Sequence, residues 1–220
     1  MKKIVVIAAA GKGNRLGAGM PKCLVEINGH AIFEYLLKAF EWADEIRMVV
    51  GYKAELVKEK VQAINLSVKF IENREYETTN TLQSNYIGMK GTKDLVLFID
   101  GDMIISKKTS KYLLDKYNEN EECIGVTRDI SEQPVFAEVQ ECKVQGFDYE
   151  KRTEFEWANI ALLNPNKLEY LPTYFFTQIQ KFLPIDSLEV ERLEVDTRSD
   201  LEYAERQISE HPEKYDYWKV

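Results

Sequence analysis

Residues 1–105 alternate between short apolar runs and amphipathic stretches, and this alternation limits the fold more than any other feature. Residues 4–10 form an unbroken apolar run rich in β-branched side chains, which is typical of a strand buried on both faces. Residues 94–102 form a second such run and end on two acids. Alternating strands and helices predict a parallel sheet covered by helices. The other elements expected here are helices at 31–43 and 53–64, strands at 46–52 and 66–72, and a helix from a cap at Thr79 or Asn80 to Met89.

From residue 106 onward shorter β-like runs predominate, which indicates a mixed, antiparallel-tending second half. No repeat, low-complexity tract or linker separates the halves, so we expect a single domain over residues 1–220. The expected fold class is α/β, a Rossmann-like three-layer α/β/α sandwich with a mixed, mostly parallel central sheet. The elements expected in this half are helices at 106–118 and about 168–182, strands at 123–128, 135–141, 143–149, 158–164 and 188–196, and a helix from Arg198.

Composition narrows the functional classes. The net charge is −8, which argues against a nucleic-acid partner. Three widely spaced cysteines suit reduced thiols in the cytoplasm, and two histidines in unremarkable contexts disfavour a zinc site or a serine–histidine–aspartate triad. The seven-residue apolar run at 4–10 is short for a signal peptide and far too short to span a membrane. We therefore expect a cytoplasmic protein with no membrane partner.

A glycine-rich loop follows the first strand, and neither standard glycine-loop pattern fits it. Gly11 and Gly13 match the start of the G-x-G-x-x-G dinucleotide fingerprint, but Leu16 occupies the third position and Gly17 comes one place late. The P-loop pattern also fails, because no Gly-Lys-Ser/Thr sequence is present at the required spacing. What remains is A-A-G-x-G-x-R, followed by Pro-Lys.

The residue types of this loop suit a polyphosphate. Glycines let backbone N–H groups approach phosphate oxygens closely. Arg15 offers a bidentate clamp, and Lys22, which follows Pro21, offers a compact positive charge. Ligands of open α/β sheets bind beyond the carboxyl ends of the strands, which places Asp102 at the same edge as the loop.

Three segments in this order resemble the signature of nucleotidyltransferases with a glycosyltransferase-A-like fold: "AAAGKGNRLGAGMPKCLVEINGHAIFEYLLKAF", "FIDGDMII" and "EVDTRSDLEYAE". This family includes MobA-like NTP transferases, phosphocholine cytidylyltransferases and sugar-1-phosphate nucleotidylyltransferases. The resemblance runs from Lys3 to about Ile208. It implies transfer of a nucleoside monophosphate from an NTP to a phosphate on a small acceptor, with release of pyrophosphate. It also implies an NTP-binding half up to about residue 105 and an acceptor-binding half from about residue 106.

The resemblance also implies roles for individual residues. Asp102 and Asp196 are expected to bind Mg²⁺, and Lys22 and Arg15 to be catalytic, stabilising charge on the α-phosphate and on the departing pyrophosphate. Three of these residues have a structural alternative: Lys22 could be a solvated loop lysine, Asp102 could belong to a turn at the strand end, and Asp196 could be the N-cap of the last helix, shared with Thr197. The residues expected to bind the nucleotide are Ala9, Ala10, Gly11, Gly13 and Asp100. The glycines alone could make only a tight turn, and Asp100 could belong to the strand-end turn or support the site without touching the ligand.

Two further pairs are candidates for base and acceptor recognition. Asn80 and Ser84 lie four residues apart on one helix face, and in relatives a helix start here brings short polar side chains to the base and ribose. Their N-T-x-x-S spacing resembles the phosphocholine cytidylyltransferases and favours CTP over UTP or TTP. Glu156 and Trp157 lie among acids and aromatics, which suits an ammonium group through cation–π contact. The alternatives are helix capping for the first pair and core packing for the second.

Together these observations predict a Mg²⁺-dependent cytidylyltransferase. Its partners would be CTP and a phosphorylated or phosphonylated amino alcohol such as phosphocholine or 2-aminoethylphosphonate. The alternative enzyme is a sugar-1-phosphate or polyol-phosphate nucleotidylyltransferase with the same catalytic set. The non-enzymatic alternative is an NTP-binding regulatory module. The oligomeric state is left open, with a homodimer as one arrangement.

Overall fold

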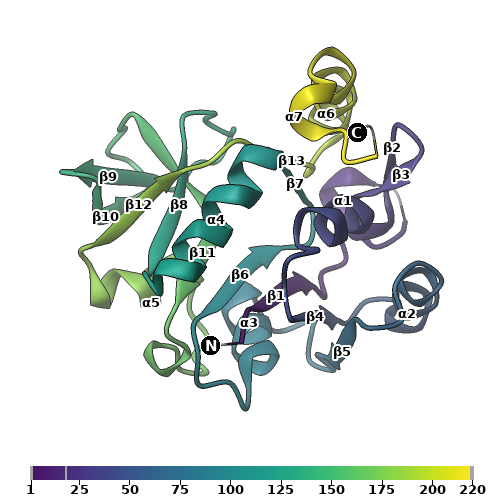
Figure 1. Ribbon diagram of the computed structural model, residues 1–220, viewed down its shortest axis with the longest axis horizontal. Helices are drawn as coiled ribbons and strands as arrows, with labels where there is room; N and C mark the ends of the chain where they lie inside the picture. The colour runs from purple at the N-terminus through teal and green to yellow at the C-terminus, as the bar shows by residue number, and fades with distance from the viewer. Residues whose placement is uncertain (1, 18, 219–220) are drawn as a thin grey trace.

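A nine-stranded sheet runs through the middle of the molecule and includes strands from both halves of the chain (Figure 1). The computed structural model describes residues 2–17 and 19–218. β1 lies between β4 and β6 and pairs with both in parallel, so its apolar side chains are buried on both faces. In spatial order the strands are β5 (Lys69–Glu72), β4 (Glu45–Val50), β1 (Ile4–Ala9), β6 (Val96–Asp100), β11 (Phe155–Leu163), β8 (Cys123–Thr127), β12 (Ile185–Glu189), β10 (Lys143–Asp148) and β9 (Phe136–Gln140).

The sheet is mixed, as expected, but parallel pairing does not predominate. Among the described residues, four strand pairings of this sheet are parallel and five are antiparallel. The parallel pairings lie mainly in the first half, where helices connect the strands. In the second half β11 runs antiparallel to β6, β8 and β9. Hairpin-type connections after residue 120 therefore replace the crossovers that a mostly parallel sheet would need.

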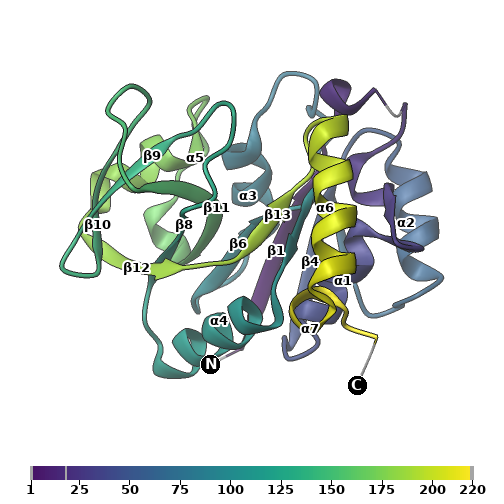
Figure 2. The ribbon, with the colours of Figure 1, turned by 90° about the horizontal axis from the view of Figure 1, so that it is seen from above.

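Helices cover both faces of the sheet and give the expected three layers. α3 (Thr81–Met89) and α5 (Phe175–Ile179) lie on one face, and α4 (Lys107–Glu119) lies on the other (Figure 2). α1 (Ile32–Ala39) and α2 (Ala54–Gln62) share the apolar cluster of the α4 face. A separate cluster packs the hairpin of β2 (Glu26–Ile27) and β3 (His30–Ala31) against α1, α6 (Arg198–Glu210) and α7 (Pro212–Tyr215). The α/β sandwich predicted from the sequence is confirmed.

A two-stranded ribbon stands beside the main sheet. It consists of β7 (Met103–Ile105) and β13 (Arg192–Glu194), which pair antiparallel. The sequence predicts one continuous strand at 188–196, and this prediction is wrong. The chain leaves the main sheet after β12, because Val190 donates to the carbonyl of Val126 while Glu191 accepts from the amide of Ser106. β13 therefore belongs to the ribbon.

The helix expected at about 168–182 is also largely absent. Only α5 and the 3₁₀ turn Gln180–Phe182 form there, and a further 3₁₀ turn, Pro165–Lys167, lies just before it. Pro172 lacks an amide donor and disfavours the helical conformation at the preceding residue, which explains the late start of α5. None of the helices formed by the described residues is long and apolar enough to cross a membrane.

Candidate active site

The glycine loop after β1 is shaped by the side chain of Lys22. Gly13 adopts a left-handed conformation with φ of +62°, and a Cβ at this position would lie 2.5 Å from Cγ of Lys22. Pro21 precedes the 3₁₀ turn Lys22–Leu24, in which Cys23 and Leu24 are buried and anchor the turn. Glycine at residue 13 therefore leaves the space through which the lysine reaches the edge of the sheet.

Asp102 and Asp196 meet because the β7–β13 ribbon joins the segments that carry them. Gly101 donates from its amide to the carbonyl of Ala8 at 2.8 Å, which holds the end of β6 against β1. The carbonyl of Asp102 accepts a hydrogen bond from the amide of Val195 at 3.0 Å. The two carboxylates thus lie at the same end of the ribbon, although they are distant in the sequence.

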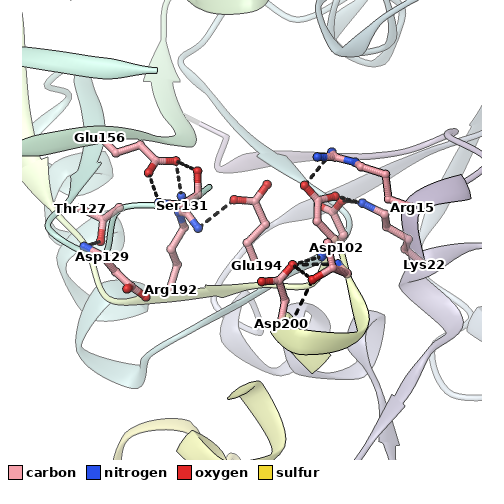
Figure 3. A network of polar contacts seen from close by, with 12 residues as sticks. Arg15, Lys22, Asp102, Thr127, Asp129, Ser131, Glu156, Arg192, Glu194 and Asp200 are labelled. Atoms are coloured by element: carbon pink, nitrogen blue, oxygen red, sulfur yellow. Dashed lines mark hydrogen bonds and ion pairs between the residues drawn. The ribbon is translucent and has the colours of Figure 1, made fainter. Parts of the chain in front are cut away.

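Two cations pair with these two carboxylates (Figure 3). Lys22 Nζ lies 2.8 Å from Asp102 Oδ2 and also donates to Asp196 Oδ1. Arg15 Nη2 lies 2.6 Å from Asp196 Oδ2. The Lys22 side chain is only 14% exposed, so it does not project into bulk solvent. Burial lowers its pKa, but Asp102 and then Asp196 outweigh this effect and raise the pKa above the ordinary value of 10.5.

The side chain of Asp196 does not cap the last helix. Thr197 is the N-cap of α6, and its hydroxyl accepts from the amide of Asp200. The Asp200 carboxylate in turn accepts from the amides of Asp196 and Thr197. Backbone capping fixes the start of the helix, and the Asp196 carboxylate is left to pair with Lys22 and Arg15.

A cavity of about 300 Å³ opens between the glycine loop and the end of β6. Ala10 is not among its lining residues and is buried in the core on the α3 face. Burial, then the neighbouring charge of Asp102, raise the pKa of Asp100 well above its ordinary value, while Lys22 opposes this shift. Of the residues predicted from the sequence, the cavity is lined by Ala9, Gly11, Gly13, Arg15, Lys22, Asp100 and Asp102.

The donor set suits a hard divalent cation. Asp102 Oδ1 is buried and has no hydrogen-bond partner among the described residues, so this oxygen has an unused lone pair beside Asp196. Mg²⁺ prefers carboxylate oxygens and keeps waters and substrate phosphates as its remaining ligands, so two carboxylates are enough. Within the described parts of the chain no cluster of three or more His, Cys, Asp or Glu side chains is arranged to hold a metal by itself. Any Mg²⁺ here would need further oxygen ligands, from water or from a bound phosphate.

The two residues predicted to contact the base both make internal contacts. Asn80 is the N-cap of α3, with Oδ1 accepting from the amide of Gln83, and its Nδ2 donates to the carbonyl of Thr173 at 2.8 Å. Ser84 is buried and accepts from Nδ2 of Asn73 at 3.1 Å. Thr81, in the first turn of the same helix, lines the cavity. The N-terminus of α3 thus borders the site through a residue that the sequence analysis did not single out.

The two residues predicted at the acceptor side lie at the start of β11, and both are buried. Glu156 is 4% exposed and accepts hydrogen bonds from Ser131 and Arg192. Trp157 is 3% exposed and packs edge-to-face against Phe147 and Phe175. Neither side chain is exposed to a ligand. Any role that they have at the acceptor would therefore be indirect, through the residues that they contact.

A chain of charged residues links Glu156 to the aspartate pair, and the sequence analysis missed most of it (Figure 3). Arg192 lies between Glu156, at 3.1 Å, and Glu194, at 2.8 Å. Burial raises the pKa of Glu194 to about 7; Arg192 opposes this shift, whereas Asp102 and Asp196 add to it. Arg192, Glu194 and Asp196 alternate with the buried Leu193 and Val195, a period of two that the sequence does contain.

The geometry defines a class: an α/β fold whose first βα loop offers cations and glycines opposite a pair of carboxylates. A family model described as "MobA-like NTP transferase domain" matches residues 5–146. The chain belongs to this family of NTP transferases.

Solved structures with the same fold cover nearly the whole chain. The CTP:phosphocholine cytidylyltransferase of Streptococcus pneumoniae has a TM-score of 0.80 at 19% identity, covering 94% of this chain and 100% of that one. The inositol-1-phosphate CTP transferase of T. maritima has a TM-score of 0.78 at 16% identity, covering 94% and 95%. A UDP-glucose pyrophosphorylase of Acinetobacter baumanii has a TM-score of 0.75 at 14% identity, covering 96% and 95%. At these identities the likeness shows the fold alone.

Curated relatives match about half of the chain. The bifunctional protein GlmU of Cyanothece sp. is 31% identical over 120 residues, covering 53% of this chain and 26% of that protein. The protein of the same name from Nostoc sp. is 30% identical over 122 residues, covering 54% and 27%. The matched region thus spans about a quarter of the length of these relatives.

Proposed function

We propose that this chain is a Mg²⁺-dependent cytidylyltransferase that transfers CMP from CTP to a small phosphorylated or phosphonylated amino alcohol and releases pyrophosphate. The observation that carries the proposal is the convergence of Lys22 and Arg15 on Asp102 and Asp196. Arg15, Lys22 and Asp102 line the cavity, and Asp196 joins them through its ion pairs with the two cations. Two cations and two carboxylates at one place can receive an anionic substrate together with its metal. Membership of the NTP transferase family supports this assignment.

The reaction requires positioning and charge neutralisation rather than a covalent intermediate. A phosphate or phosphonate oxygen of the acceptor attacks the α-phosphorus of CTP, and the bond to the bridging oxygen breaks to release pyrophosphate. Lys22 would contact the α-phosphate, where charge grows, and Arg15 would hold the leaving pyrophosphate. Asp102 and Asp196 would hold Mg²⁺, which neutralises phosphate charge when bound. Both cations would then exchange their carboxylate partners for phosphate oxygens.

Support for CTP and for an amino alcohol comes from two directions. Two of the proteins that share the fold are CTP transferases, one of them acting on phosphocholine. The N-terminus of α3 borders the cavity through Thr81, so we place the cytosine edge at this helix. Asn80 and Ser84, whose polar groups make internal contacts, would act there by holding the start of the helix in place. On the acceptor side, Glu156 and Glu194 are two carboxylates that share one arginine, Arg192, and this excess of acidic groups favours a positively charged substituent on the acceptor.

A sugar-1-phosphate or polyol-phosphate acceptor is the second candidate. A UDP-glucose pyrophosphorylase shares the fold over 96% of the chain, and the curated relatives are sequence matches to bifunctional GlmU proteins. Trp157, the aromatic residue predicted to receive an ammonium group, is buried, which weakens the case for direct cation–π recognition by that ring. Both candidates use the same four residues around the phosphates.

The test is pyrophosphate release from each of CTP, UTP, dTTP and ATP, with an acceptor panel of phosphocholine, 2-aminoethylphosphonate, glucose-1-phosphate and inositol-1-phosphate. We expect the highest kcat/KM with CTP and one of the two amino acceptors. A preference for a sugar phosphate would replace the acceptor assignment with the second candidate. Tight NTP binding without pyrophosphate release for any combination of NTP and acceptor would contradict the proposal that the chain is an enzyme and would favour a regulatory module.

A further inference from the structure

Arg192 is a buried arginine that the proposed reaction does not use. It is 5% exposed, and its guanidinium group faces two carboxylates on different elements. Nη2 lies 3.1 Å from Glu156 Oε1 on β11, and Nη1 lies 2.8 Å from Glu194 Oε2 on β13. Arg192 therefore links the main sheet to the ribbon that places Asp102 beside Asp196.

Glu156 extends this link to the loop at 128–134. Its Oε2 accepts from the amide of Ser131 at 2.6 Å, and its Oε1 accepts from the Ser131 hydroxyl at 2.9 Å. Both carboxylate oxygens are thus engaged, and the side chain is almost fully buried. Such a carboxylate holds its neighbours in place and is not available to bind a ligand directly.

The loop at 128–134 lies at the same edge of the sheet as the candidate site. β11 runs antiparallel to both β6 and β8, so β8 points in the same direction as β6 and β1. The chain that follows Thr127 therefore emerges at the edge where the glycine loop and Asp102 lie. Figure 3 shows Ser131, Arg192 and Glu194 in one row that leads towards Asp102. This is the edge at which ligands of open α/β sheets bind.

The contacts of Arg192 are better suited to holding the two carboxylates in position than to stabilising the folded protein. Nε of Arg192 is buried without a hydrogen-bond partner among the described residues, which lowers stability. A well-packed apolar side chain often replaces a buried ion pair with no loss of stability. A guanidinium group, however, can hold two carboxylates at fixed angles at the same time, which an ammonium group does less well.

We infer that Arg192 is a positioning residue for the acceptor: through Glu156 and Ser131 it fixes the loop at 128–134 at a set distance from the ribbon that carries Asp102 and Asp196. This inference rests on the proposed function and adds to it that the acceptor binds between that loop and the aspartates Asp102 and Asp196. Loss of Arg192 leaves the buried Glu156 and the partly exposed Glu194 without the cation between them, and the loop then moves away from the site. Acceptor binding should weaken, while the glycine loop and its NTP contacts keep their geometry.

The experiment compares Arg192→Met, Arg192→Lys and Glu156→Gln with wild type. Arg47→Met is the matched control, because Arg47 pairs with the buried Glu45 at 2.5 Å near the start of β4, at the opposite edge of the sheet. Steady-state assays measure the KM of acceptor, the KM of CTP and kcat. Hydrogen exchange measures the protection of amides in residues 128–134 without relying on turnover.

We expect Arg192→Met to raise the acceptor KM by about tenfold or more, to change the CTP KM by less than about threefold, and to speed exchange in residues 128–134. Arg192→Lys should recover part of this loss, Glu156→Gln should shift the acceptor KM in the same direction, and Arg47→Met should leave both KM values unchanged.

The inference is overturned if the acceptor KM and the loop exchange of Arg192→Met match wild type. It is equally overturned if both KM values and kcat deteriorate together, as in a general loss of structure. If Arg192→Met does not fold, Glu156→Gln decides by the same two measurements. Failure of the proposed function looks different: wild type then turns over no acceptor, while loop exchange still reports on Arg192.

Discussion

The side chain of Lys22 passes so close to Gly13 that a Cβ on residue 13 would lie 2.5 Å from the lysine Cγ. The same lysine ends between Asp102 and Asp196. The turn that shapes the loop and the charge that pairs with the carboxylates are therefore parts of one arrangement. A side chain on residue 13 would disturb both at once.

We predict that Gly13→Ala lowers kcat/KM by about 10- to 100-fold, because Lys22 must shift and because a left-handed φ costs alanine about 1 kcal/mol. The control is Gly146→Ala in β10, where a Cβ would meet no atom within 4 Å. Steady-state pyrophosphate release and thermal unfolding are measured for both variants. A kcat/KM equal to that of wild type in Gly13→Ala would show that the close approach of the Lys22 side chain to residue 13 does not affect catalysis.

Removing the charge of Lys22 should reveal the metal site in thermal unfolding. In Lys22→Met the carboxylates of Asp102 and Asp196 lose the cation between them, so we expect a lower Tm in the presence of a chelator. Added Mg²⁺ should raise the Tm of this variant more than that of wild type, because the metal replaces the lost positive charge. The matched control is Lys38→Met, which removes an exposed lysine paired with Glu41. The same Mg²⁺ response in both variants would contradict the assignment of the aspartates.

Glu45 should contribute a pH-dependent part of the stability. This carboxylate is almost fully buried; burial raises its pKa, but Lys2, Lys69 and Arg47 outweigh burial and lower the pKa to about 2, from an ordinary value of 4.5. A depressed pKa means that the stabilisation is complete above about pH 4.5 and is lost as the pH falls towards about 2.

We therefore predict that Glu45→Gln lowers the free energy of unfolding by about 2 kcal/mol near pH 7 and that the difference shrinks progressively below pH 4.5. Urea unfolding at several pH values measures it, with Glu59→Gln on the exposed face of α2 as the control. A difference that does not depend on pH would assign the effect to packing rather than to charge.

The three thiols should differ sharply in reactivity. Burial raises the pKa of Cys23 and of Cys123 to about 12, whereas Cys142 is exposed. A thiolate-specific reagent should label about one thiol per native chain and all three after unfolding in urea. Cys142→Ser should abolish the fast labelling. Rapid modification of Cys23 in the native protein would show that the turn after Pro21 is open.

Much of the fold could be predicted from the sequence where local pattern and tertiary environment agree. The apolar run that became β1 and the cap at Asn80 are examples, because a strand buried on both faces and a polar N-cap leave direct signatures. The β2–β3 hairpin was missed, although Asn28 and Gly29 both have positive φ and the Asn-Gly pair is a strong turn signal. In the second half, the pairing of β11 with three strands depends on long-range contacts that no local pattern encodes.

The same division holds for the candidate site. The motif residues Arg15, Lys22, Asp102 and Asp196 were predicted as a group, and the structure brings them together. The contacts of Glu156 with Ser131 and Arg192 were not predicted. These contacts depend on how β11, β13 and the loop at 128–134 pack together. The alternation along residues 192–196 shows which side chains of β13 share a face, but not which residues of β11 or the loop lie against them.

The central claim is that the glycine loop and the aspartate pair together receive a nucleoside triphosphate with Mg²⁺. Isothermal titration of CTP into wild type and into Asp196→Asn, with Mg²⁺ and with a chelator, tests it most directly. We predict that CTP binding to wild type weakens by about tenfold or more when Mg²⁺ is removed, and that Asp196→Asn shows little of this dependence. Equal CTP affinity in all four titrations would contradict the account.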